Sequence, residues 1–168
     1  MKKTARESLR PDFAPFRIGG MKLLHHPPVY FTLTTLLGLG IGRWINLKCL
    51  FPSGTWVFSL ILSLLAFAIA TVAIVHFKLK CTAVRPFHEP TALVHTGLYH
   101  ITRNPMYLAL LLTQVAILTA FSEPLSLVVV PVFWWILHTG FVVREEQILR
   151  EKFGEQYERY VDKTRRWL

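Results

Sequence analysis

The feature that most constrains this chain is a stretch of 21 residues, from Thr55 to Val75, without one charged side chain. An α-helix needs about 20 apolar residues to cross the hydrocarbon core of a bilayer. Only 17% of all residues are charged, whereas about 25% is usual in a soluble domain. The stretch therefore predicts a transmembrane helix, and we expect a membrane protein.

Three further apolar segments extend this prediction to an all-α, polytopic transmembrane helical bundle of about four spans. The turn at Ser122–Pro124 is short, so the last two spans are expected to form an antiparallel hairpin. After them, two amphipathic helices are expected at 144–153 and 155–163, separated at Gly154. The spans are expected at about 29–45, 55–77, 105–121 and 125–143.

The lysines and arginines lie mostly on one side of this expected bundle. A basic arm, 1–28, contains six of them, and it precedes a single membrane domain, 29–168. Within that domain, the site loop, 78–104, contains four and the tail, 144–168, contains seven. Cytoplasmic segments carry the excess of Lys and Arg, so we expect a multi-pass protein of the cell (inner) membrane with both termini cytoplasmic. The two remaining basic residues, on the opposite side, are Arg43 and Lys48.

Charge and cysteine content exclude several classes of function. The formal net charge of +9 comes from segments that flank apolar spans, where membrane lipids are the natural partner. No zinc-finger spacing or RNA-binding motif accompanies it, so no nucleic acid partner is expected. Cys49 and Cys81 would lie on opposite sides of the membrane as free thiols. No group of His, Cys or acidic residues has metal-ligand spacing, so no metal is expected.

The third expected span begins with a pattern that favours binding of an anion. In Arg103-Asn104-Pro105, Asn is a good N-cap and Pro is favoured at the first helical position. The free backbone N–H groups of a helix N-terminus attract carboxylates and phosphates, and Arg103 adds a fixed charge. We therefore expect an anionic group to dock here.

The hairpin would bring Glu145 and Glu146, at the end of the fourth span, beside this anion site. A helix C-terminus disfavours anions, so a cationic or hydroxyl-bearing partner is expected. For Glu146, an exposed ion pair with Arg150 one turn away explains the residue as well as a functional role does. Glu145 shares a face with apolar Phe141 and Leu149, which favours function. S-Adenosyl-L-methionine combines the carboxylate, hydroxyls and cation that such a site would accept.

Two motifs, separated by one hairpin, carry a family resemblance. The first is the run from Pro90 to Leu108, and the second begins with Arg144-Glu145-Glu146 and continues through Leu149, Phe153-Gly154, Tyr157, Tyr160 and Arg166-Trp167. Together they resemble the signature of the isoprenylcysteine carboxyl methyltransferase and phospholipid methyltransferase superfamily, over about residues 85–168. The chain departs from the common bacterial pattern at Leu98, where Pro is frequent, and at His100, where Arg or Lys is frequent.

The resemblance implies an integral membrane enzyme that transfers a methyl group from S-adenosyl-L-methionine to a hydrophobic or lipid-like acceptor. That acceptor could be an isoprenylcysteine-type carboxylate, a lipid amine or a thiol. Catalytic roles are expected for Arg103 and Glu145. The cofactor is expected to contact Val94, His95, Gly97, Tyr99, Arg103, Asn104, Pro105, Tyr107, Glu145 and Glu146.

Two other functions fit the sequence less well. A membrane reductase of the sterol or enone type would bind NADPH, whose phosphates call for more basic residues in the site loop than Arg85 and Arg103. A noncatalytic membrane adaptor would use the basic tail to bind anionic lipid. That function leaves the expected proximity of Arg103 and Glu145 unexplained.

Overall fold

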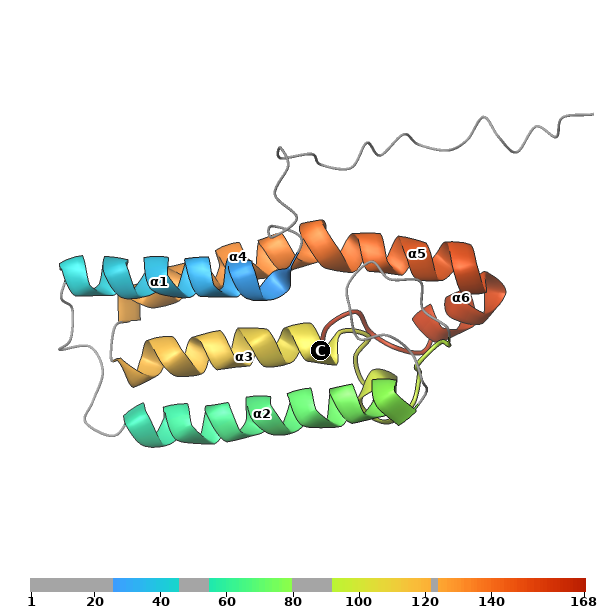
Figure 1. Cartoon of the computed structure of the whole chain (residues 1–168), viewed down its shortest axis with the longest axis horizontal. Helices are drawn as coiled ribbons and strands as arrows, with labels where there is room; N and C mark the ends of the chain where they lie inside the picture. Colours follow the sequence, from blue (N-terminus) through green and yellow to red (C-terminus); the bar gives the residue numbers. More distant parts are fainter. Residues whose placement is uncertain (1–25, 46–54, 80–91, 122–123) are drawn as a thin grey trace, which may run out of the picture.

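The computed structural model describes residues 26–45, 55–79, 92–121 and 124–168, and this part of the chain is helical (Figure 1). The one pairing of extended backbone there is a parallel bridge between Thr102 and Arg165. Most of the basic arm, together with Cys49 and Cys81, lies outside the described residues. The helices are α1 (Pro27–Ile45), α2 (Thr55–Leu79), the 3-10 helix η3 (Gly97–His100), α3 (Pro105–Ala120), the 3-10 helix η4 (Pro124–Val128), α4 (Val129–Leu137), the π-helix η5 (His138–Val142), α5 (Val143–Phe153) and α6 (Glu155–Val161).

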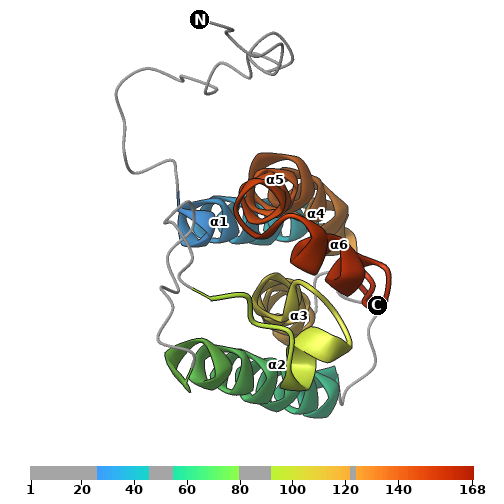
Figure 2. The same ribbon diagram turned by 90° about the vertical axis from the view of Figure 1, so that its right-hand side faces the viewer.

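Helix α3 lies at the centre of the bundle, with α2 on one side and α1 and α4 on the other (Figures 1 and 2). A stripe of small residues on α2, Ser59, Ala66 and Ala73, is buried against it. Small side chains at this seven-residue spacing let two helices approach closely in lipid. At the far end of the stripe, the hydroxyls of Ser59 and Thr119 are hydrogen-bonded at 2.8 Å.

The remaining surface of α2 is apolar and exposed. Its 25 residues span about 37 Å at 1.5 Å per residue, and only 17% of its most apolar stretch is buried. A core helix of a soluble protein would be buried by its own fold, so this surface is suited to lipid. Among the described residues, two helical segments are long and apolar enough to cross a membrane, Thr55–Leu79 and Leu125–Phe153.

The other two predicted spans form helices, but shorter or less apolar ones. Helix α1 begins at Pro27, two residues before the expected start, and has 19 residues. Helix α3 has 16 residues and is about 24 Å long, which is less than the hydrocarbon thickness of about 30 Å. At one crossing, α1 is in close contact with the helical segment Leu125–Phe153, which we call the fourth segment, because a Cβ added at Gly38 would lie 2.9 Å from Val129 Cγ2.

The fourth segment corrects one prediction from the sequence. The polar residues after Val143 were expected to start a separate helix, but the helix continues without a break from Leu125 to Phe153. It passes through Pro131 and through the π-helical turn η5. The predicted break at Gly154 is confirmed, since its φ of +48° ends α5 before α6 begins. The site loop also differs from expectation, because α2 reaches Leu79 and η3 forms within the loop.

Candidate functional site

A cavity of about 530 Å³ opens where α5, α6 and the site loop meet the beginning of α3. Its lining combines tyrosines, carboxyl groups and other polar residues with a larger number of apolar residues. The cavity extends along α3 as far as Thr113, which is eight residues beyond Pro105 and therefore about 12 Å further along the helix. The cavity thus joins the polar end of the bundle to the depth of its apolar helices.

Glu145 stands on the wall of this cavity with a single hydroxyl partner. The Tyr107 hydroxyl donates a hydrogen bond of 2.8 Å to Glu145 Oε1. In the described ranges, no basic side chain lies within ion-pair distance of Glu145. The antiparallel arrangement of α3 and the fourth segment, predicted from the short turn, produces this contact. The hydroxyl partner of Glu145 is thus Tyr107, but the helix-end argument that predicted a partner does not apply, because the helix continues to Phe153.

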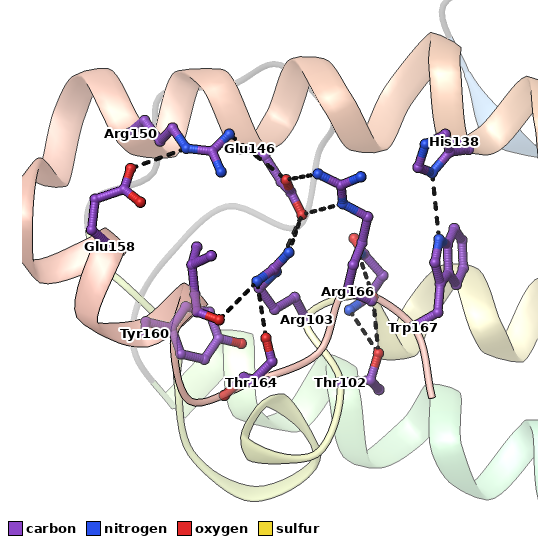
Figure 3. A network of polar contacts seen from close by, with 12 residues as sticks. Thr102, Arg103, His138, Glu146, Arg150, Glu158, Tyr160, Thr164, Arg166 and Trp167 are labelled. Atoms are coloured by element: carbon purple, nitrogen blue, oxygen red, sulfur yellow. Dashed lines mark hydrogen bonds and ion pairs between the residues drawn. The ribbon is translucent and has the colours of Figure 1, made fainter.

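Glu146, by contrast, is buried and surrounded by three arginines (Figure 3). Arg166 donates two hydrogen bonds to its carboxylate, at 2.9 and 2.7 Å. Arg103 Nη2 lies 3.1 Å from Oε1, and Arg150 Nη1 lies 3.8 Å from Oε2. The pair with Arg150 therefore exists, but the interpretation of Glu146 as part of an exposed ion pair is wrong, because the residue is only 3% exposed.

Arg103 reaches the cavity, but the protein itself occupies its guanidinium group. Besides Glu146, Nη1 donates to the carbonyls of Val161 at 3.2 Å and Thr164 at 2.9 Å. Asn104 was expected to cap α3, yet its side chain makes no cap hydrogen bond and Nδ2 donates instead to the Arg166 carbonyl at 2.8 Å. The start of α3 is thus tied to the tail.

The last residues of the chain form what we call the C-terminal strap, residues 161–168, which crosses the start of α3. The backbone N–H of Arg103 donates to the Arg165 carbonyl at 2.9 Å. The indole N–H of Trp167 lies 3.4 Å from Nδ1 of His138, whose ring stacks on Trp134 with 5.2 Å between centroids. Figure 3 shows Arg166 and Trp167 extending from the strap towards the fourth segment. The second sequence motif contains both residues, but nothing local to them indicated these partners.

Of the ten residues expected to contact the cofactor, eight line the cavity and two do not. His95 is exposed, and its Nδ1 lies 3.3 Å from the Leu93 carbonyl. Gly97 has a φ of +62°, and a Cβ there would lie 2.1 Å from Nε2 of His76. Its position therefore requires glycine for packing. The eight are Val94, Tyr99, Arg103, Asn104, Pro105, Tyr107, Glu145 and Glu146.

Sequence reasoning missed a second group of cavity residues. Tyr157 and Tyr160 of α6 line it, although the motif that contains them suggested no role. Helix α2 supplies apolar wall residues for which hydrophobicity was the only signal, and the start of α1 supplies His26. These additional α2 residues are Ala70, Ile74 and Phe77.

Three tyrosines at this end of the molecule, Tyr99, Tyr157 and Tyr160, lie outside the two membrane-length helices. Burial keeps their side chains in the neutral form. It raises the pKa of Tyr157 to about 12, and the nearby Glu146 carboxylate adds to the effect. Burial likewise raises the pKa of Tyr99 and of Tyr160 above the ordinary value. The hydrogen bonds to Glu146 raise the pKa of Arg166. The three phenols are therefore hydrogen-bond donors at any physiological pH.

An all-helical fold with two membrane-length helices is suited to a membrane protein, and its cavity is lined by both polar and apolar residues. The family model of phospholipid methyltransferases matches residues 54–156, and the chain belongs to this family. The resemblance found in the sequence is thereby confirmed. The family is one of membrane methyltransferases.

Individual relatives agree with this assignment over shorter stretches. An uncharacterized protein of Haemophilus influenzae is 40% identical over 63 residues, which are 38% of this chain and all of the relative. Two rice proteins, from Oryza sativa subsp. indica and subsp. japonica, are each described as a probable protein-S-isoprenylcysteine O-methyltransferase. Each is 30% identical over 78 residues, 46% of this chain and 41% of the relative. No solved structure matches the chain.

Proposed function

We propose that this protein is an integral membrane methyltransferase that takes its methyl group from S-adenosyl-L-methionine and passes it to a hydrophobic or membrane-borne acceptor. The observation that carries the proposal is the Glu145 carboxyl group, which lies on the cavity wall and has Tyr107 as its one hydrogen-bond partner among the described residues. The family match supports the reaction class. The cofactor and the acceptor are our inference.

The residues of the cavity fit such a cofactor. A carboxyl group without a basic neighbour among the described residues is a suitable contact for a sulfonium or an ammonium group. Glu146 is not, because its charge is already balanced by Arg103 and Arg166. The volume of about 530 Å³ also lies in the range of about 300–1,000 Å³ that is usual for small-molecule sites.

The chain's own residues would bind and orient the cofactor and the acceptor, and they would exclude water. S-Adenosyl-L-methionine, when bound, supplies an electrophilic methyl group. Tyr107 fixes Glu145 through Oε1, which leaves Oε2 to face a cation or to accept a proton from an amine or thiol acceptor. A carboxylate acceptor is already ionised and needs no base. Apolar side chains such as Ile74 and Leu110 keep the deeper part of the cavity dry.

Calorimetry of the purified protein tests the proposal. S-Adenosyl-L-methionine and NADPH are titrated separately into the wild-type chain in lipid nanodiscs. Saturable binding of S-adenosyl-L-methionine, weakened in Glu145→Gln, is the expected result. Binding of NADPH alone would overturn the proposal in favour of a reductase. Binding of neither, with tight association to anionic vesicles, would instead support a lipid-binding adaptor.

A further inference from the structure

Two tyrosines of α6 line the same cavity, but their hydroxyl groups differ. Tyr160 donates a hydrogen bond to the Tyr99 carbonyl. Tyr157, one turn earlier, is only 1% exposed, and its hydroxyl has no hydrogen-bond partner in the described part of the chain. A buried hydroxyl without a partner is disfavoured, and such groups in native proteins call for an explanation.

The surroundings of Tyr157 limit what the missing partner is. Leu93 and the partly buried Leu149 and Phe153 pack with the two tyrosines into one apolar cluster. The rings of Tyr157 and Tyr160 meet at 64° with 6.0 Å between centroids. The Arg150 guanidinium lies 5.6 Å from the Tyr157 ring centre. Apolar and aromatic walls suit a flat ligand group, and a neutral phenol suits an acceptor atom on its edge.

The ionisation of Tyr157 agrees with a donor role. Its pKa is raised to about 12, chiefly by burial. The hydroxyl therefore retains its proton and offers it at physiological pH. Nearby charge does not replace this role, because the guanidinium groups of Arg103 and Arg166 are already directed to Glu146.

We infer that the cavity end formed by Leu93, Leu149, Tyr157 and Tyr160 holds the purine ring of the cofactor, with the Tyr157 hydroxyl donating a hydrogen bond to a ring nitrogen. The inference rests on the proposed function and assigns an orientation to it, with the purine at α6 and the sulfonium towards Glu145. Tyr157 lies just beyond residues 54–156, so the family match does not assign it a role.

The test compares Tyr157→Phe with Tyr160→Phe, since each substitution removes one oxygen atom. Without ligand, Tyr157→Phe should leave the thermal midpoint unchanged or raise it, because it removes an unsatisfied hydroxyl. Tyr160→Phe should lower the midpoint, because it leaves the Tyr99 carbonyl without its donor. An equal loss of stability in both variants would show that Tyr157 already has a protein partner, and it would overturn the inference.

Two ligands then locate the contact by calorimetry. S-Adenosylhomocysteine and methylthioadenosine share the purine, but only the first has an amino-acid part. Tyr157→Phe should weaken both by the same factor, about 3- to 10-fold for one neutral hydrogen bond. A loss confined to S-adenosylhomocysteine would place Tyr157 at the amino-acid end, and no loss for either would remove it from the site. Wild-type protein that binds neither ligand would contradict the proposed function itself.

Discussion

At the scale of single residues, two adjacent carboxyl groups have opposite surroundings. Glu145 faces the cavity and contacts a hydroxyl, whereas Glu146 is buried among arginines. Successive residues on a helix point about 100° apart, so one carboxyl group is directed to Tyr107 and the next to the arginines. Substitutions of the two residues should therefore separate binding from stability.

We expect Glu145→Gln to weaken S-adenosyl-L-methionine by about 10- to 150-fold, because a charge-assisted contact is worth roughly 1.5–3 kcal/mol. Its thermal stability should change little, since the amide oxygen still accepts from Tyr107. Glu146→Gln is the matched control. It should lower the free energy of unfolding by about 3 kcal/mol, because buried arginine charge loses its counter-ion. Calorimetry and thermal unfolding measure the two effects, and equal stability losses would contradict the division of roles.

Arg103 was expected to bind the cofactor's carboxylate, but its guanidinium contacts Glu146 and two strap carbonyls. Arg103→Ala should therefore lower thermal stability and cofactor affinity together. A decarboxylated analogue of S-adenosyl-L-methionine distinguishes the two functions. If Arg103 acts through the scaffold, the analogue loses as much affinity as the parent compound. A smaller loss for the analogue would instead support direct contact between Arg103 and the cofactor's carboxylate.

At the scale of elements, Gly97 shows why the site loop turns where it does. Its left-handed conformation alone makes Gly97→Ala unfavourable by about 1–3 kcal/mol. The added Cβ would also overlap the His76 ring of α2. We expect the double variant His76→Ala/Gly97→Ala to recover the part due to overlap but not the part due to φ. Chemical unfolding of the wild type, the two single variants and the double variant measures both parts. If the two substitutions changed the free energy of unfolding additively, the overlap with His76 would be excluded.

The C-terminal strap contacts both the start of α3 and the fourth segment. A chain that ends at Arg165 loses the Arg166 contacts to Glu146 and the Trp167 contact to His138. We expect it to keep its helical circular dichroism but to unfold at a lower temperature and to bind cofactor weakly. Removing only Leu168, which is 73% exposed, is the control and should have no effect. Normal cofactor binding by the shorter chain would mean that the strap does not shape the site.

At the scale of the whole molecule, we propose four spans with both termini in the cytoplasm. Reporter fusions after Lys22, within 46–54, within 80–91 and at Leu168 should read inside, outside, inside and inside. An impermeant maleimide should accordingly label Cys49 and Cys81 from opposite faces of the membrane. A fusion within 80–91 that reads outside would invalidate the topology and separate the site from the cytoplasm.

The sequence predicted those parts of the fold that one segment determines alone. An uncharged run as long as 55–75 predicts a helix because a bilayer leaves the backbone no other way to satisfy its hydrogen bonds. A short turn places Glu145 beside the start of α3 for a similar local reason. The end of the fourth helix was mistaken because a polar residue at Arg144 marks a change of surroundings, whereas Glu, Gln, Leu and Arg all continue a helix.

Contacts between distant segments were beyond such reasoning. The partner that Glu146 contacts most closely, Arg166, is 20 residues away on the strap, across the break at Gly154. The direction of the chain after that break depends on one left-handed residue and on the packing of α6. The contacts of Arg103 with the strap could not be foreseen for the same reason, since its carbonyl partners come from residues about 60 positions later.

The unbroken helix from Leu125 to Phe153 would set the depth of the proposed site relative to the lipid. Glu145 is 20 residues from Leu125, or about 30 Å along the axis, which equals the thickness of the hydrocarbon layer. In the proposed topology, the carboxyl group is therefore held at the boundary between acyl chains and headgroups. An acceptor would be selected by the depth at which it carries its reactive atom, and a thinner or thicker bilayer would change the rate without altering any residue of the site.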